Sequence, residues 1–215
     1  MFRKLSAMET LDEYIESHIS PEPELLYETY RYTNNHHVYP HMCSGHAQGR
    51  VLKMLTSMIA PQRVLELGCY TGYSTLCIAE ALQPGAELHT VEIDDELADE
   101  LTARFARSPR ADAIHLHIGD AFSIVPALEG GWDMVFIDAN KRTYAEYFEM
   151  IMPQMRRGGF ILVDNTLWGG KILDADARDA QTEGIRRFND LVARDPRVET
   201  AILPLRDGLT LLRVL

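Results

Sequence analysis

The sequence predicts an α/β protein with a seven-stranded, mostly parallel sheet, helices on both faces and extra helices at the N-terminus. From residue 63 onward, short apolar runs alternate with helical patterns, which is typical of a parallel sheet covered on both faces. Only residues 204–208 separate the last two predicted strands, so the last strand should be antiparallel, forming a hairpin. Because no repeat, linker or low-complexity tract divides the 215 residues, we expect one domain over residues 1–215.

Three helices are expected before the sheet, over residues 11–18, 21–32 and 48–60. The first follows a polar start, and the second opens with prolines and acidic residues, which are helix-start signals. The third places apolar side chains at helical spacing and stops before Pro61. The predicted N-terminal region therefore spans residues 1–60, and the predicted strand–helix core spans residues 61–215.

The core is predicted to alternate strands and helices in chain order. Strands are expected over residues 63–67, 87–91, 113–118, 134–137, 160–163, 198–203 and 209–214. Helices are expected over residues 75–82, 96–106, 122–128, 144–155 and 184–193. Pro84 and Gly85 end the first of these helices, and the Arg-Gly-Gly sequence at residues 157–159 is expected to form a turn before the fifth strand.

The composition narrows the class of protein. A formal net charge of −11 and a pI of about 5.1 disfavour general attraction to nucleic acid or to anionic membranes. No apolar run approaches the roughly 18–20 residues that a membrane helix needs, and residues 1–10 lack the pattern of a signal peptide. Cys43, Cys69 and Cys77 have no metal-binding spacing and fit reduced thiols, so we expect a cytoplasmic protein.

Two apolar runs, residues 134–137 and 159–163, end in polar side chains. The first run is followed by Asp138, Asn140 and Lys141, and the second by Asp164 and Asn165. If these runs are neighbouring parallel strands, the polar residues meet at the edge where open α/β sheets bind ligands. Oxygen donors beside an amine there suggest a hard divalent cation next to a general base. Capping of the next helix explains one such aspartate easily, but two such strand ends less well.

A glycine loop, residues 66–72 with the sequence Glu-Leu-Gly-Cys-Tyr-Thr-Gly, follows the first predicted strand. Its Gly-x-x-x-Gly spacing is neither the dinucleotide fingerprint nor a P-loop, and no lysine or arginine lies nearby to hold a phosphate. Glu66 favours a ligand with positive charge or hydroxyl donors. Glu92 and Asp120, which end the next two strands, suit a ribose and an adenine edge, although Glu92 also fits a solvated acid near a helix start. A nucleoside with a positive centre and no phosphate suggests S-adenosylmethionine.

Four segments, residues 64–74, 136–141, 163–170 and 203–209, carry a resemblance to class I S-adenosylmethionine-dependent methyltransferases. More narrowly, the chain resembles the cation-dependent O-methyltransferase family that includes the caffeoyl-CoA and catechol enzymes and many small bacterial relatives. The resemblance extends from about Tyr30 to the C-terminus. It implies a Rossmann-like core, S-adenosylmethionine as cofactor, and Mg²⁺ or another divalent cation such as Mn²⁺ or Ca²⁺. It further implies N-terminal helices that complete the substrate pocket and support a homodimer.

The resemblance also implies roles for individual residues. Asp138, Asp164 and Asn165 would bind the cation, with Asp138 and Lys141 as catalytic residues and Lys141 as the base. Lys141 would also contact the substrate. Independently of the resemblance, Trp168 is expected beside the substrate, since an aromatic residue after the metal ligands can form an apolar wall, although core packing explains this tryptophan equally well. The cofactor site would be lined by Met42, Ser44, Glu66, Gly68, Tyr70, Gly72, Ser74, Glu92, Asp120, Ala121, Asp138 and Tyr147.

Two positions depart from the plant members of this family. Many of those enzymes have Asp where this chain has Asn140, and Asn where it has Gly169. These positions lie beside the substrate, which disfavours a phenylpropanoid-CoA acceptor of the plant type.

A histidine cluster precedes the core and consists of His36, His37, His41 and His46. Its spacing matches no standard zinc pattern, so we expect a loop near the active site rather than a metal centre.

The leading functional expectation is methylation of a hydroxyl on a small catechol-like or vicinal-diol aromatic. A second possibility keeps the chemistry and takes a hydroxyuridine in transfer RNA as acceptor. The acidic balance leans against RNA, although a local patch could form from Arg104, Arg107, Arg110, Arg156, Arg157, Arg186 and Arg187. A third possibility is a non-catalytic protein that binds S-adenosylmethionine, which the retained metal and base residues disfavour.

Overall fold

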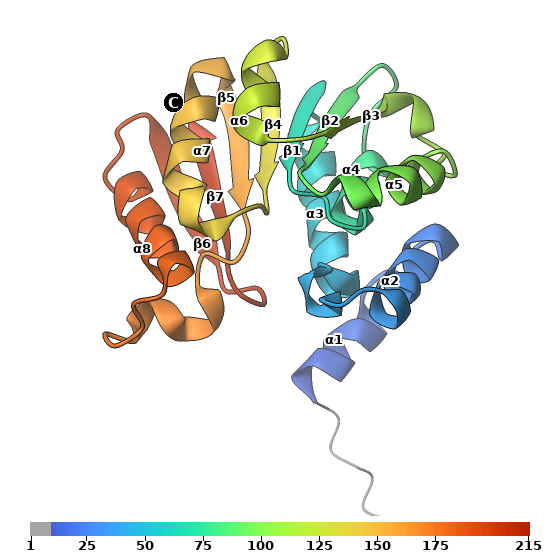
Figure 1. The fold of residues 1–215 in the computed structure, drawn as a ribbon, viewed down its shortest axis with the longest axis horizontal. Coiled ribbons are helices and arrows are strands. Elements are labelled where there is room, and N and C mark those ends of the chain that lie inside the picture. The colour runs from blue at the N-terminus through green and yellow to red at the C-terminus, as the bar shows by residue number, and fades with distance from the viewer. Residues whose placement is uncertain (1–9) are drawn as a thin grey trace, which may run out of the picture.

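The computed structural model describes residues 10–215, and a seven-stranded sheet of order β3-β2-β1-β4-β5-β7-β6 forms its centre (Figure 1). The strands are β1 (Arg63–Leu67), β2 (Glu87–Glu92), β3 (Ile114–Ile118), β4 (Trp132–Ile137), β5 (Met155–Val163), β6 (Val198–Leu203) and β7 (Leu209–Val214). The first five pair in parallel, and β7 is antiparallel to both β5 and β6. The predicted mostly parallel sheet with an antiparallel last strand is confirmed.

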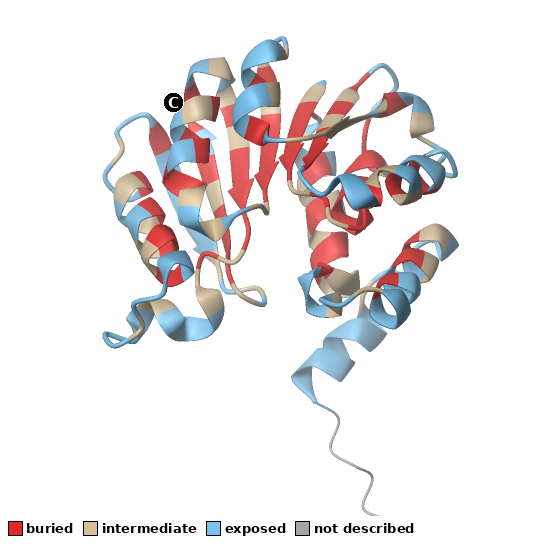
Figure 2. Cartoon of the chain, viewed as in Figure 1, coloured by how far each residue is buried: buried red, intermediate tan, exposed pale blue. Residues whose placement is uncertain are grey.

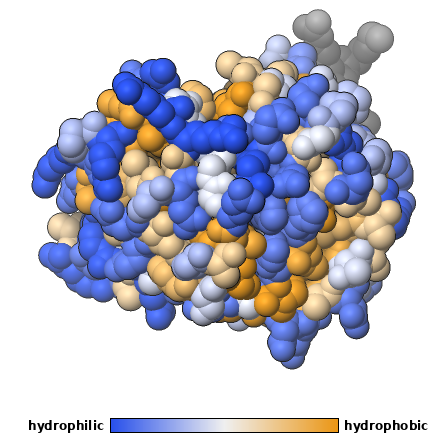
Figure 3. Space-filling view, turned by 90° about the horizontal axis from the view of Figure 1, so that it is seen from above, coloured by the Kyte–Doolittle hydropathy of each residue, from blue (hydrophilic) through white to orange (hydrophobic). Residues whose placement is uncertain are grey.

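Alternating side chains of the strands feed two apolar clusters on opposite faces of the sheet. One cluster joins β-strand residues such as Val64 and Phe136 to α3 (Gly45–Ile59), α4 (Tyr73–Ala79) and α5 (Ala98–Phe105). The other joins residues such as Leu65 and Val135 to α6 (Ala121–Ile124), α7 (Tyr144–Ile151) and α8 (Ala180–Val192). The central strands are accordingly buried (Figure 2), whereas the view from above shows a largely hydrophilic surface (Figure 3).

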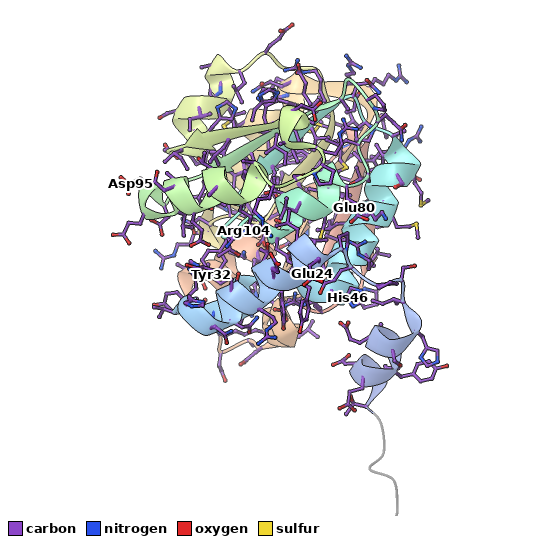
Figure 4. All side chains as sticks on the ribbon, turned by 90° about the vertical axis from the view of Figure 1, so that its right-hand side faces the viewer. Glu24, Tyr32, His46, Glu80, Asp95 and Arg104 are labelled. Atoms are coloured by element: carbon purple, nitrogen blue, oxygen red, sulfur yellow. The ribbon has the colours of Figure 1, made fainter. Side chains whose placement is uncertain are left out.

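The two N-terminal helices, α1 (Leu11–His18) and α2 (Glu24–His36), lie outside the sheet layers (Figure 1). α2 packs on the core through Leu26, Thr29 and Thr33, while α1 buries no residue and projects away from the body. His46 of α3 bonds Glu16 of α1 at 2.5 Å, and this contact ties the two helices together (Figure 4). Much of the surface of α1 and α2 is therefore uncovered.

Several predicted boundaries are wrong by a few residues. The second helix begins at Glu24 rather than at residue 21, because Pro23 adopts an extended conformation and precedes the first turn. α8 begins at Ala180 rather than at 184, because Asp179 accepts a hydrogen bond from the N–H of Thr182 and caps the helix. The expected turn at residues 157–159 lies inside β5, where the pairing with β4 shifts register and Gly158 adopts a positive φ of 82°. Gly158 and Gly159 therefore form an irregularity within β5 and do not form a turn before it.

Short 3₁₀ helices connect the main elements, and the sequence did not distinguish them from α-helices or loops. Three of them are η1 (Pro40–Met42), η5 (Lys141–Thr143) and η7 (Trp168–Leu173). The others are η2 (Asp95–Leu97), η3 (Ala111–Ala113), η4 (Val125–Ala127) and η6 (Met152–Gln154). A 3₁₀ turn of three residues carries no apolar periodicity, and such turns are therefore invisible to pattern reading.

Candidate active site

A cavity of about 550 Å³ opens at the carboxyl ends of the parallel strands, as expected for an open α/β sheet. Most of the predicted site residues line it: Met42, Ser44, Gly68, Tyr70, Ser74, Glu92, Asp120, Ala121, Asp138, Lys141, Tyr147, Asp164, Asn165 and Trp168. Two predicted cofactor residues, Glu66 and Gly72, are not among the residues that line the cavity. The fold thus brings residues that are spread over more than 120 positions of the sequence together around one cavity.

The glycine loop owes its shape to the close approach of β1 and β4. A Cβ on Gly68, whose φ is +82°, would lie 2.4 Å from the carbonyl oxygen of Asp138. A Cβ on Gly72, with φ +83°, would lie 2.5 Å from the ring of Phe105. Both positions therefore require glycine, because neighbouring protein segments pack closely against them. Gly72 does not line the cavity, so its glycine is explained by this packing and not by contact with a ligand.

Glu92 fixes the same loop with its carboxylate. Its Oε2 accepts hydrogen bonds from the N–H groups of Cys69 (3.2 Å) and Tyr70 (2.7 Å). Its Oε1 accepts from the N–H groups of Ile93 (2.9 Å) and Asp94 (3.1 Å). Glu92 is 7% exposed and borders the cavity, so the alternative interpretation of a solvated acid is wrong.

Glu66 lies beneath the loop and is completely buried. Its Oε2 accepts hydrogen bonds from the hydroxyls of Thr75 (2.5 Å) and Thr90 (2.7 Å), and its Oε1 has no partner among residues 10–215. Burial raises the pKa of Glu66 to about 7, while the hydroxyl hydrogen bonds oppose the rise. This carboxyl group supports the loop from the protein interior and does not face the hollow.

The two acidic strand ends meet as the sequence predicts. Lys141 Nζ lies 2.6 Å from Asp138 Oδ1, and both side chains are only 16% exposed. Asp164 is nearly buried, and its Oδ1 accepts a hydrogen bond from the N–H of Asn165 at 2.7 Å. Burial raises the pKa of Asp164 to about 7, and the neighbouring charge of Asp138 acts in the same direction.

The donor set suits a hard divalent cation. No group of three or more His, Cys, Asp or Glu side chains is arranged to hold a metal within residues 10–215. Asp138, Asp164 and Asn165 nevertheless border one cavity and offer two carboxylates and an amide oxygen, which are ligands for Mg²⁺, Mn²⁺ or Ca²⁺. Burial and, after it, the charge of Asp138 raise the pKa of Asp164, and a bound cation would oppose both effects.

Sequence reasoning missed Gln48 and Arg206 as site residues. Gln48 is buried on α3, and its Nε2 donates a hydrogen bond to Asp164 Oδ2 at 2.6 Å. Arg206, in the hairpin between β6 and β7, lines the cavity and donates to the carbonyl oxygens of Cys43 and Ser44. Gln48 carried only a helix-start signal in the sequence, and Arg206 only its place within a family-like segment.

The histidines of the predicted cluster separate in space. Only His41 lines the cavity. His36 bonds the carbonyl of Tyr32, His37 bonds Glu100, and His46 bonds Glu16, so each has its own partner. The expectation of a loop near the site, rather than a metal centre, therefore fits one member of the cluster.

Aromatic side chains form two walls of the cavity. Tyr147 stacks on Phe122 with ring centroids 4.9 Å apart, and both residues line the hollow. Trp168 lines it on the side of Asn165, at a positive φ of 50°. The tryptophan is therefore placed at the cavity and is not part of the two apolar cores.

Comparison with known proteins identifies the class. Residues 16–215 match the O-methyltransferase family. Tricin synthase 2 of Oryza sativa subsp. japonica is 31% identical over 98% of this chain and 77% of its own length. The catechol O-methyltransferase of Niastella koreensis is 34% identical over 73% of this chain and 72% of its own length.

Solved structures agree with these relatives. The O-methyltransferase TomG of Streptomyces achromogenes, in complex with S-adenosylmethionine, is 32% identical with a TM-score of 0.87, covering 95% of each chain. The O-methyltransferase of Bacillus cereus, in complex with SAH, is 28% identical with a TM-score of 0.88, covering 95% of this chain and 97% of that one. Fold and cavity thus define an S-adenosylmethionine-dependent O-methyltransferase. The chain belongs to the O-methyltransferase family of the caffeoyl-CoA and catechol enzymes, and it is an enzyme.

Proposed function

We propose that this enzyme transfers the methyl group of S-adenosylmethionine to one hydroxyl of a small catechol-like or vicinal-diol aromatic, with the help of a divalent cation. The observation that carries the proposal is the meeting of Asp138, Lys141, Asp164 and Asn165 beside the glycine loop in a single cavity. The catechol O-methyltransferase among the relatives supports this acceptor class.

The cofactor would lie against the glycine loop. Glu92 and Asp120 would contact the nucleoside, and Met42 and Ser44 line the same cavity. Tyr147, stacked on Phe122, offers an aromatic face to the same space. In this placement Asp138 lies between donor and acceptor, because it adjoins both Gly68 and Lys141.

The chemistry would depend on position and on proton transfer. Lys141 Nζ, held by Asp138 at 2.6 Å, is the group placed to take the proton of the attacking hydroxyl. A divalent cation on Asp138, Asp164 and Asn165 would lower the pKa of two adjacent hydroxyls and fix their orientation. Trp168 would form an apolar wall for the ring. In-line placement of the hydroxyl oxygen and the methyl carbon supplies much of the rate.

The test measures methyl transfer from labelled S-adenosylmethionine to a panel of catechols, with Mg²⁺ and after metal removal. We expect transfer to depend on the cation, and Lys141→Met to lower kcat by roughly 10²–10⁴-fold. Lys171→Met is the matched control, since Lys171 is exposed and pairs with Asp179 outside the cavity. Full activity of Asp164→Ala in metal-stripped buffer would refute the metal mechanism.

Cation binding has a readout that does not depend on turnover. Titration of the wild-type protein with Mn²⁺, followed by calorimetry, should give one strong site per chain. Asp138→Ala and Asp164→Ala should each abolish it, because each removes one of the two carboxylates in the proposed set of cation ligands. Retention of the site in both variants would place the cation elsewhere.

The transfer-RNA alternative gains no support from the arginines proposed for a basic patch. Most of them pair with acidic side chains, namely Arg104, Arg107, Arg110, Arg156, Arg186 and Arg187. Paired arginines offer little free charge to phosphates. Hydroxyuridine RNA belongs in the same acceptor panel, and transfer to RNA alone would replace the catechol proposal.

We also propose a homodimer formed through helices α1, α2 and α3. These helices expose several large apolar side chains: Leu11, Tyr14, Ile15, Tyr27, Met54 and Met58. Exposed apolar area of this kind commonly marks an interface.

A cytoplasmic location remains a prediction, in keeping with three cysteines that are all free and buried. No helix among residues 10–215 is long and apolar enough to cross a membrane.

A further inference from the structure

The hairpin loop of residues 204–208 contacts the acceptor side of the cavity through its backbone. The carbonyl oxygen of Asp207 accepts hydrogen bonds from the N–H groups of Leu167 (2.7 Å) and Trp168 (3.0 Å). The carbonyl oxygen of Gly208 accepts one from Thr166 at 3.1 Å. The hairpin therefore supports the segment that carries Asn165 and Trp168.

The same hairpin contacts the segment of residues 40–44 through one side chain. Arg206 Nη1 donates hydrogen bonds to the carbonyl oxygens of Cys43, at 3.1 Å, and of Ser44. Within residues 40–44, the backbone bonds from Met42 to Tyr39 and from Cys43 to Pro40 are local turns. The guanidinium thus ties this segment to a part of the chain more than 160 residues away.

Arg206 has an unfavourable backbone conformation for an arginine. Its φ is +48°, in the left-handed region where glycine carries no steric cost. A side chain retained at such a position indicates that its contacts outweigh the local strain. Arg206 contacts the carbonyl groups of Cys43 and Ser44, in the segment that also holds Met42.

We propose that Arg206 is a positioning residue for the cofactor: it holds residues 42–44 in place over the donor side of the cavity before S-adenosylmethionine binds. The proposal rests on the proposed placement of the cofactor against Met42 and Ser44. A wall that is ordered in advance binds more tightly, because the ligand does not bear the entropic cost of ordering it. The hairpin thereby connects residues 42–44, which would contact the cofactor, to residues 166–168, which lie beside the proposed acceptor site.

The decisive variant is Arg206→Gly, which removes the guanidinium and relieves the positive φ. Loss of a charge-assisted hydrogen-bond pair is expected to weaken the binding of S-adenosylhomocysteine roughly tenfold, as measured by calorimetry. The melting temperature of the ligand-free variant should fall only slightly, since relief of the positive φ offsets part of the lost contacts. Arg206→Met, which keeps the aliphatic stem, should show the same loss of affinity.

Arg213→Met is the matched control, because Arg213 is an exposed arginine of β7 that pairs with Glu199 and does not line the cavity. It should bind the ligand like the wild type. In turnover assays, the KM for S-adenosylmethionine should rise more in Arg206→Gly than kcat falls. Unchanged ligand affinity in both Arg206 variants would overturn the proposal.

Hydrogen exchange of the ligand-free protein gives an independent readout. The amides of Met42 and Cys43 should exchange faster in Arg206→Gly than in the wild type and in Arg213→Met. Equal exchange in all three proteins would overturn the proposal even if affinity changed. If the wild type itself bound no ligand, the proposed function would fail, whereas the exchange experiment would still decide the role of Arg206.

Discussion

At the scale of single residues, the site is governed by the partners of two buried carboxyl groups. Asp164 depends on Gln48, whose Nε2 lies 2.6 Å from its Oδ2. Glu66 depends on two threonine hydroxyls and has one oxygen without a partner among the described residues. The hydrogen-bond partners of both acids come from other segments of the chain. The sequence therefore could not predict the burial and the partners of either carboxyl group.

Gln48→Ala tests this dependence. Because the change leaves a buried carboxylate oxygen of Asp164 without its donor, the free energy of unfolding should fall by about 1–3 kcal/mol. Mn²⁺ affinity should also weaken, since the carboxylate loses the contact that orients it. Urea denaturation and calorimetry measure the two effects. Gln62→Ala, an exposed glutamine, should change neither quantity. Wild-type values in Gln48→Ala would show that Asp164 is positioned by its other contacts.

At the scale of elements, the end of β1 is fitted to the end of β4. Gly68→Ala should lower the free energy of unfolding by about 2–4 kcal/mol, because the new Cβ would meet the carbonyl of Asp138 at 2.4 Å and the φ is positive. Gly85→Ala separates the two causes, since Gly85 has φ +84° and no atom within 4 Å of the added Cβ. It should cost about 1 kcal/mol. Equal losses in chemical denaturation would mean that strand crowding adds nothing.

The pairing of β2 with β3 places three histidines against one another. His89 stacks on His115 and on His117, with ring centroids 4.8 and 5.3 Å apart, and its Nδ1 lies 3.0 Å from His117 Nε2. Burial lowers the pKa of His89 to about 4, helped by the charges of His115, His117 and Arg63 and opposed by Glu87. Burial also lowers the pKa of His117.

This cluster predicts a loss of stability in acid. The folded-state pKa of His89 lies below its ordinary value of 6.5, so the unfolded chain binds the proton first. Stability from neutral His89 is present above pH 6.5 and is lost as the pH falls toward 4. The raised pKa values of Glu66 and Asp164 have the opposite effect, because these acids bind protons more readily in the folded state and so favour folding as the pH falls. The contribution of His89 is therefore measured by comparing the wild type with a variant. His89→Gln should flatten the decline in urea midpoint between pH 7.5 and 5, whereas His41→Gln, at an exposed position, should not.

At the scale of the whole molecule, the uncovered N-terminal helices predict association. Met58, which is 77% exposed on α3, is a suitable site for a charge. Met58→Asp should weaken the proposed dimer at least tenfold, because a carboxylate would be buried without a partner. Light scattering over a dilution series measures the change. Ile202→Asp, on the edge strand β6, is the control. If it alone broke the dimer, the interface would lie at the sheet edge, and a monomeric wild type would refute the dimer.

The sequence predicted the fold well where a pattern repeats along the chain. Strands that are rich in apolar residues, such as β4 and β1, were placed within two residues of their observed bounds. Helix starts were less accurate, because the cap of α8 depends on one Asp179 hydrogen bond and the prolines before α2 are extended. The division into residues 1–60 and 61–215 stays a prediction, and residues 1–9 lie outside the described part of the chain.

The sequence by itself determined the alternation of strands and helices, the glycine loop and the acidic strand ends, because periodicity and turn chemistry act over a few neighbouring residues. Only the tertiary structure decided which side chains face the cavity. It turned Glu66 into the interior, packed Gly72 on Phe105, and brought Gln48 to Asp164 across 116 positions and Arg206 to Cys43 across 163. These contacts arise from packing between distant segments, which leaves no periodic mark in the chain.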